Sequence, residues 1–376
     1  LASLMGLDEG IKNKEILALL SALFLAISPW HIQFSRYDHE ANFMLFFSLL
    51  GITLYLFSLK KPFLLSLSAL SFAIAINTYH GAKVLVPVLL LSVLLIYRKD
   101  LFKTPKKLIV PIIILLLSFL PIILNIDNGL KRTQTVGIFK EENKVDIFTK
   151  NYLAHFSPSF LFVDGDQFGR HSVTGIGHLF IFQLPLILLG LFYLLKEQNQ
   201  GKSKPLLLAL LLSAAVPAAF ANPSPHALRS IFFAPMWSIV TALGVLVLLE
   251  LKTKKWLKSG LLSILVFIAA YNIITYLHLY YKHEPLLKAR DWQDGYAEMV
   301  AFVDSQKDNY NSIAISNYFG RPYIFVLFYS TYDPKTYQTQ SENKEAFDKF
   351  EFFGGSWEKT KEGKALIVTP YWQSHP

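Results

Sequence analysis

LIVPIIILLLSFLPIIL, at residues 108–124, contains no charged side chain. A second run, LLSILVFIAAYNIITYL at residues 261–277, is equally free of charge. A helix of roughly 17 to 25 apolar residues is long enough to cross the hydrocarbon core of a bilayer. These two runs therefore predict membrane-spanning helices.

Similar apolar windows recur over residues 1–282. The 376-residue chain is 53% hydrophobic and only 17% charged, whereas about a quarter of the residues in a typical soluble domain are charged. Several windows are short and contain proline, so kinks and tilts are expected. We predict an all-α polytopic membrane domain with about nine transmembrane helices. The windows fall at about 15–30, 41–59, 62–78, 82–97, 107–125, 178–195, 205–221, 229–250 and 257–279.

Basic residues cluster in alternate short loops between these windows. The short loops that alternate with these basic loops hold only Arg36, Lys83 and Arg229. Because Lys and Arg concentrate in cytoplasmic loops, this alternation predicts which loops face outward. The basic set is Lys12, Lys14, Lys60, Lys61, Arg98, Lys99, Lys103, Lys106, Lys107, Lys196, Lys202, Lys204, Lys252, Lys254, Lys255 and Lys258.

The outward side then receives a long loop over 126–177 and a tail over 283–376. The tail has a helical period at 292–306 and strand-like runs at 312–317 and 365–370. We predict a small C-terminal extracytoplasmic α/β domain, which could be incomplete at its end. The expected location is a multi-pass protein of the plasma membrane, with the lipid bilayer as one partner.

The formal charge of +9 does not indicate nucleic-acid binding, because the basic residues lie in short clusters between apolar runs. Cysteine is absent. This composition excludes disulfides, a thiolate nucleophile and cysteine-ligated metals.

Three outward turns each carry one cation close to the membrane surface, namely Arg36, Lys83 and Arg229. His80 and His226 lie beside the last two. A phosphate between a lipid and a sugar is an anion at this depth, and arginine can bind it with two hydrogen bonds. The alternative is that these cations pair with lipid headgroups or nearby carboxylates.

Asp38 and Glu40 are weak candidates for a catalytic base, since sugar transfer from a lipid phosphate requires a carboxylate that accepts the proton of the acceptor hydroxyl. Asp38 could instead cap a helix, and Glu40 could complement a helix dipole. No cofactor is required by the sequence. A divalent metal bound by His39, Glu40 and His226 is a further hypothesis that sequence spacing cannot test.

The segment FVDGDQFGRHSVTGIGH at residues 162–178 is polar and punctuated by glycine. Arg170 and His171 in this segment are candidates for substrate binding, together with Asp164 and Asp166. The alternative interpretation is a turn-rich loop without a binding role.

Four segments resemble bacterial members of the GT-C glycosyltransferase superfamily, specifically the protein mannosyltransferase-like proteins of glycosyltransferase family 39 and the aminoarabinose transferases. They are SPWHIQFSRYDHEANF (28–43), NTYHGAKVLVPVLL (77–90), HFSPSFLFVDGDQFGRHSVTGIGHLF (155–180) and NPSPHALRSIFFAPMW (222–237). The resemblance covers most of residues 15–250 in the same order.

The resemblance implies a polyprenyl-phosphate sugar donor and a catalytic carboxylate, often an Asp-Glu pair, in the first outer loop. This sequence begins with the tail of an apolar segment. We therefore expect an N-terminally truncated protein whose catalytic base lies upstream of Leu1, and an inactive 376-residue chain. The residues carried over for binding of the donor phosphate and sugar are Arg36 with Glu40, His80 with Lys83, and His226 with Arg229.

The expected function is transfer of a sugar from a polyprenyl-phosphate donor to a protein, lipid or glycan acceptor on the outer face of the membrane. An O-antigen polymerase or ligase is the alternative enzyme. A transporter or flippase for a lipid-linked glycan is the non-enzymatic alternative, and it would need polar residues along a path through the helices.

Overall fold

The computed structural model describes residues 14–37, 39–103, 105–126, 135–196, 201–340, 346–355 and 363–370. The chain divides into two compact units, Leu1–Tyr281 and Lys282–Pro376. This division lies next to the boundary expected from the sequence. The two units are described separately below.

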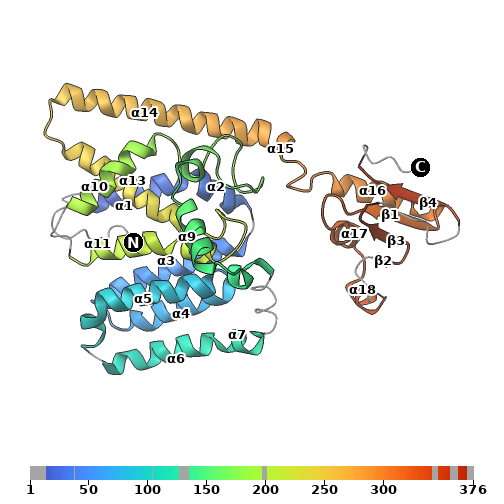
Figure 1. Ribbon diagram of the computed structural model, residues 1–376, viewed down its shortest axis with the longest axis horizontal. Helices are drawn as coiled ribbons and strands as arrows, with labels where there is room; N and C mark the ends of the chain where they lie inside the picture. Colours follow the sequence, from blue (N-terminus) through green and yellow to red (C-terminus); the bar gives the residue numbers. More distant parts are fainter. Residues whose placement is uncertain are drawn as a thin grey trace. The chain divides into compact units, whose positions relative to one another are not determined.

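Each of the nine apolar windows contains helix, and the first unit is predominantly helical (Figure 1). The longer helices pack side by side, with α3 against α4, α4 against α6, and α10 and α1 against α13. The helices are α1 (Lys14–Ala26), α2 (Pro29–Arg36), α3 (Glu40–Ser58), α4 (Leu64–Thr78), α5 (Ala82–Leu101), α6 (Ile109–Ser118), α7 (Leu120–Leu124), α9 (Lys144–Ala154), α10 (Gln183–Lys196), α11 (Ser203–Ser213), α12 (Val216–Ala219), α13 (Phe233–Glu250) and α14 (Lys255–His278).

Four helical stretches in the described part of the chain are long and apolar enough to cross a membrane: Glu40–Ser58, Pro105–Leu124, Phe233–Glu250 and Lys255–Leu287. A fifth arises if α1 and α2, bent by 59°, form one broken span. The other windows hold shorter or more charged helices. These lengths are compatible with a membrane protein, and the structure supports four or five spans directly rather than the nine predicted.

Burial differs sharply among these stretches. In α13, 83% of the apolar window is buried, whereas only 6% is buried in the α14 stretch and in Pro105–Leu124. A helix that is apolar on all sides belongs inside a protein or a membrane. Helix α13 is therefore the central helix of the first unit, and α14 and α6 present apolar side chains outward.

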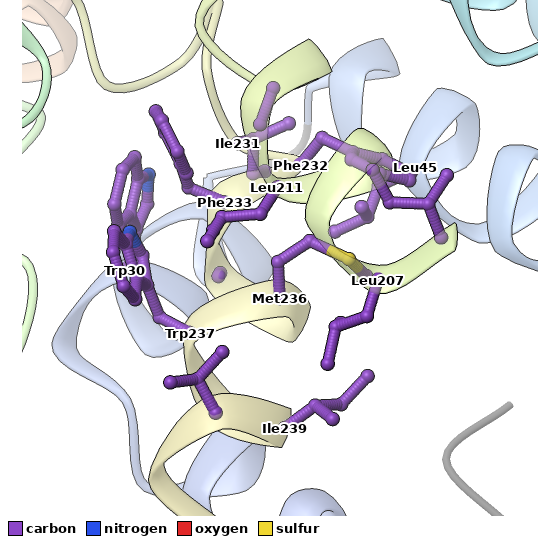
Figure 2. Packing of buried hydrophobic residues seen from close by; sticks show 14 of the residues in the cluster. Trp30, Leu45, Leu207, Leu211, Ile231, Phe232, Phe233, Met236, Trp237 and Ile239 are labelled. Atoms are coloured by element: carbon purple, nitrogen blue, oxygen red, sulfur yellow. The ribbon is translucent and has the colours of Figure 1, made fainter. Parts of the chain in front are cut away.

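Close packing around α13 forms the core shown in Figure 2. Trp30 packs against Phe233, with ring centroids 5.9 Å apart, and Phe233 stacks on Trp237. Glycines let α10 approach α13 closely. A Cβ added at Gly190 would overlap the carbonyl oxygen of Val240, and one at Gly244 would overlap that of Leu186.

The second unit is a small α/β domain with a four-stranded mixed sheet. The strand order is β2-β3-β1-β4, with β1 parallel to β3 and β4, and β2 antiparallel to β3. The apolar run 322–330 contains helix α17. The elements are α15 (Glu284–Leu287), α16 (Tyr296–Gln306), β1 (Ser312–Ser316), α17 (Pro322–Tyr329), α18 (Pro334–Gln340), β2 (Ala346–Phe347), β3 (Phe350–Phe353) and β4 (Ala365–Val368).

Candidate functional site

A cavity of about 560 Å³ lies where α4 ends and α5 begins, and we call it the His80 cavity. Its volume falls in the range of roughly 300 to 1,000 Å³ that is usual for small-molecule sites. His80, Lys83 and Arg229 line it, and no acidic side chain occurs among its described lining residues. The remaining lining residues are Asn77, Tyr79, Gly81, Val84, Pro121, Ile122, Asn125, Ile126, Val136, Gly137, Phe139, Pro217, Phe220 and Ala221.

The turn between α4 and α5 supplies His80, and the first turn of α5 supplies Lys83. Tyr79 ends α4 in an extended conformation, and Gly81 precedes α5. A Cβ at Gly81 would come within 2.7 Å of the Tyr79 ring, so glycine permits this tight turn. Lys83 lies in the first turn of α5, where the helix dipole disfavours a cation. Its position does not stabilise the helix, which is consistent with a role in binding an anion.

Arg229 reaches the cavity from the segment between α12 and α13. Its Nη1 donates to the carbonyl oxygens of Asn222 at 3.2 Å and Pro223 at 3.4 Å. These acceptors belong to the same turn and carry no charge. They orient the guanidinium group.

A short backbone pairing brings together aromatic residues of the cavity lining. Gly137 and Ala221 form an antiparallel bridge, and the amide of Ile138 donates to the carbonyl of Phe220 at 3.1 Å. This pairing stacks Phe139 on Phe220, with ring centroids 5.8 Å apart and planes inclined by 10°. The lining of the cavity therefore includes both cationic and aromatic side chains.

The turn that carries Arg229 is held by a buried carboxylate. Oδ2 of Asp166 accepts hydrogen bonds from Nδ1 of His171 and from the backbone N–H of Ala227, both at 2.7 Å, and Oδ1 accepts from the N–H of Phe168 at 2.9 Å. The Asp166 side chain is completely buried. Burial by itself raises the pKa of Asp166, but the hydrogen bond and charge of His171 and the Ala227 N–H outweigh it, so the pKa lies below its usual value.

Two buried histidines complete this network. Nδ1 of His155 donates to the carbonyl of Asn151 at 2.7 Å, and its Nε2 accepts from the N–H of His226 at 3.1 Å. The acceptor role of Nε2 requires neutral His155. Burial lowers the pKa of His155 to about 4 and that of His226 to about 3. Both imidazoles are therefore neutral at pH 7.

One group of three side chains in the described part of the chain could hold a metal ion, namely Asp166, His171 and His226, whose ligand atoms lie within 4.8 Å of one another. This set differs from the predicted His39, Glu40 and His226. His39 instead contacts Glu40 at 3.2 Å and packs on Tyr79. Because both oxygens of Asp166 already accept hydrogen bonds, the network is complete without an ion.

The predicted binding residues separate into two groups. His80, Lys83 and Arg229 share the His80 cavity. Arg36 does not line it, because its guanidinium lies over the rings of Tyr280 and Tyr281 at 5.0 and 5.2 Å. Arg170 lies over the ring of Tyr37 at 5.5 Å.

His171 and His226 also lie outside the cavity lining. They are 5% and 6% exposed, and their rings pack against each other with centroids 4.9 Å apart. Their positions assign them a structural role in fixing the Arg229 turn rather than direct contact with a ligand in the cavity. Glu40 begins α3 and its side chain is half exposed. Asp38 lies outside the described residues.

Two features of the site were not found from the sequence. The sequence indicates Asp166 only as one residue of a polar loop, although it is the centre of the network in the structure. No sequence pattern indicated a role for His155. The isolated Gly137–Ala221 bridge has no strand-like sequence pattern around it, because it joins two irregular segments. In the sequence, the signal for this network is an aspartate in a loop that also contains several histidines.

No family model, curated protein or solved structure matches this chain. The functional assignment therefore depends on the chemistry of the cavity and of its supporting network.

Proposed function

We propose that this protein is a membrane glycosyltransferase of the GT-C type, with about nine helices embedded in the membrane, and that the His80 cavity binds the phosphate of a polyprenyl-phosphate sugar donor on the outer face. The sugar would pass to a protein, lipid or glycan acceptor. The observation that carries this proposal is that His80, Lys83 and Arg229 line one cavity whose described lining residues include no carboxylate.

The charge of the cavity favours an anionic ligand. Lys83 and Arg229 bring two positive charges, and His80 adds a side chain able to donate a hydrogen bond. Hydrogen bonds to charged groups are worth roughly 1.5 to 3 kcal/mol each. A phosphate between them would satisfy both cations at once, and the same contacts would stabilise the phosphate as it leaves the sugar.

The apolar side of the cavity favours a lipid-linked rather than a free phosphate. Pro121, Ile122, Phe139 and Phe220 offer a surface suited to an isoprenoid chain. In the neighbouring stretch Pro105–Leu124, the rest of the protein buries only 6% of the apolar window. This stretch is apolar enough to contact lipid. A chain entering from the bilayer could therefore follow this surface to the cations.

The interior of the helical unit argues against a flippase. Between the His80 cavity and the opposite end of α4 and α5, the buried residues include Phe72, Ile76, Leu85, Leu89 and Val93. A lipid-linked glycan crossing this region would require polar side chains along its path. The buried polar residues of α4 in this region, Ser68 and Ser71, donate to the backbone carbonyls of Gly51 and Leu67, and no buried charged side chain occurs there among the described residues, which favours a site that works at one face.

Binding of polyprenyl-phosphate mannose to the purified chain in nanodiscs tests the proposal. We expect Lys83→Met and Arg229→Met each to weaken binding by about tenfold or more, from the loss of a charge-assisted hydrogen bond. Lys99→Met is the matched control, because Lys99 lies exposed at the other end of the same helix and lines no part of this cavity.

A headgroup comparison separates charge recognition from simple lipid partitioning. Polyprenyl phosphate should compete with the donor, and the uncharged polyprenol should not. Equal competition by polyprenol, or equal binding by Lys83→Met and Lys99→Met, would refute the proposal. The products of sugar transfer would distinguish single-sugar transfer from the glycan joining expected of a polymerase or ligase.

A further inference from the structure

A second cavity, of about 840 Å³, lies at the opposite end of α4 and α5, and we call it the lysine cavity. Leu65 near the start of α4 and Tyr97 near the end of α5 line it, whereas Asn77 and Val84 line the His80 cavity. With a rise of 1.5 Å per residue, the two cavities are separated by about 20 Å along α5.

Five lysines line this cavity together with a single acidic residue, Asp100. Asp100 pairs with Lys103 at 3.1 Å and with Lys202. One carboxylate thus forms ion pairs with two lysines. The other lining lysines, Lys14, Lys60 and Lys107, form no ion pair with any described residue. Among the described residues, the cavity therefore has a surplus of positive charge, which an added anion would balance.

A buried hydroxyl gives a second and independent indication of a ligand. Tyr55 lines the cavity and is 3% exposed, and its hydroxyl has no hydrogen-bond partner among the described residues. Its ring packs edge-on against Tyr97 at 5.4 Å. Leaving a buried hydroxyl unpaired is unfavourable. An oxygen-rich ligand in the cavity would supply the missing partner.

The remaining walls are apolar and indicate that the anion belongs to a lipid. Leu56, Phe57, Leu101 and Leu108 line the cavity, and Phe57 is also 43% exposed. Just beyond the cavity, Ile109 begins helix α6, whose apolar side chains are mostly exposed on the surface of the helical unit. Lysines at loop ends could serve only to orient a membrane protein. Membrane orientation alone does not require lysines to line a cavity with apolar walls. It also does not require a buried hydroxyl without a hydrogen-bond partner.

We propose that the lysine cavity is a binding site for the phosphate headgroup of an anionic membrane phospholipid, whose acyl chains contact the apolar wall. Basic cavities between membrane helices bind anionic headgroups in this way. The site is separate from the His80 cavity and does not depend on the sugar-transfer proposal. By the charge pattern of the loops, it would lie on the cytoplasmic side, where anionic lipids contribute a negative surface potential.

Retention of lipid during detergent exchange, measured by native mass spectrometry, tests this site. The chain is reconstituted with dioleoyl-phosphatidylglycerol or dioleoyl-phosphatidylcholine, and the lipid that remains bound is counted. We expect selective retention of phosphatidylglycerol. The variant Lys60→Gln/Lys107→Gln/Lys202→Gln should lose affinity by about fivefold per lysine.

The matched control is Lys99→Gln/Lys106→Gln/Lys252→Gln, which removes the same charge from exposed lysines outside the cavity lining. This control should retain phosphatidylglycerol like the parent protein. Equal loss in both triple variants would show that retention follows total charge rather than the cavity, and would overturn the proposal. Equal retention of the two lipids would also overturn it.

Tyr55→Phe removes the hydroxyl and keeps the ring. We expect a several-fold loss of phosphatidylglycerol affinity with an unchanged melting temperature. An unchanged affinity would contradict the assignment of the hydroxyl to the headgroup. Inorganic phosphate distinguishes the source of the anion, because it should compete only weakly if the acyl chains contribute. Displacement of the lipid by low-millimolar phosphate would assign the cavity to free phosphate instead.

Discussion

The two ends of the α4–α5 helix pair, labelled in Figure 1, each lie at a cavity lined by cations, but the cations are held differently at the two ends. At the His80 cavity, Arg229 lies on a turn whose backbone is bound by buried Asp166 and His155. At the lysine cavity, the cations stand on flexible stems, and the side chains of Lys103 and Lys202 are 72% and 44% exposed.

This difference indicates two kinds of anion recognition. A guanidinium fixed by neighbouring carbonyls is preorganised for one ligand geometry, which favours selectivity and transition-state stabilisation. Flexible ammonium groups act as point charges and accept many headgroup geometries. The first arrangement suits a reacting donor, and the second suits a bulk lipid.

The largest expected effect of a single substitution comes from Asp166, which holds the turn carrying Arg229, and Asp100 at the lysine cavity provides the comparison. Asp166→Ala would leave buried donors of His171 and Ala227 unpaired and should reduce the free energy of unfolding by about 3 to 5 kcal/mol. Asp100→Ala removes a partly exposed pair and should cost only about 0 to 1 kcal/mol. Denaturation of both variants in the same detergent checks this contrast. Equal losses of unfolding free energy would show that the carboxylate at the His80 cavity matters no more for stability than the one at the lysine cavity.

A substitution remote from both cavities provides the next test. Gly244→Ala would force α13 away from α10 and should destabilise the protein by about 1 to 3 kcal/mol or more. Gly260→Ala, on exposed α14, meets no atom within 4 Å and should be neutral or stabilising by up to about 1 kcal/mol. If melting temperatures show the same change for both variants, the close packing of α10 on α13 is not needed for stability.

Lowering the pH should destabilise the histidine network beside the His80 cavity before it affects the lysine cavity. His155 and His226 have pKa values of about 4 and 3 in the folded protein, against 6.5 when unfolded. The unfolded state therefore binds more protons below pH 6.5, and stability should fall from there to about pH 4 by about 1.4 kcal/mol per pH unit for each histidine. The lowered pKa of Asp166 extends the loss further below its ordinary pKa of 3.8.

The measurement is the free energy of unfolding from pH 8 to about pH 4. In His155→Gln the slope should fall by about a third, because buried His178, whose pKa is also lowered to about 3, contributes together with His226. Phosphatidylglycerol retention at the lysine cavity should change little over the same range, because its charge comes from lysines. A flat stability profile would show that the buried histidines are not held neutral.

The smallest expected effect is the response to salt. Raising the ionic strength from about 0.05 to about 0.5 M shortens the screening length several-fold. The exposed lysines should lose headgroup affinity by about two- to fivefold, and donor binding at the His80 cavity should change less. Titration of both ligands at the two ionic strengths checks this order, and the reverse order would contradict the structural contrast.

Much of the fold follows from local patterns. Uncharged apolar runs predicted the helices, and the structure places helix in every one of the nine windows. Strand-like runs at 312–317 and 365–370 contain β1 and β4. The number of spans did not follow as directly, because α4, α10 and α11 are short, and length alone does not establish that they cross a bilayer.

The candidate site was predictable only in part. His80 and Lys83 lie three residues apart, so their proximity follows from one turn. Their meeting with Arg229, which is far away in the sequence, depends on how α12 and the 136–139 segment pack. Packing also directed Arg36 onto two tyrosines and buried His171 and His226, although all three have the same side-chain chemistry as residues that do line the cavity.

The sequence by itself determined the helical, membrane-compatible character of the first unit, because hydrophobicity and helical periodicity act between neighbouring residues along the chain. It also determined the separation of basic clusters from the apolar runs. Only the tertiary structure decided which cations share a cavity and which histidines become structural. Those outcomes depend on contacts between distant segments, where a side chain's role is set by the partner that buries it.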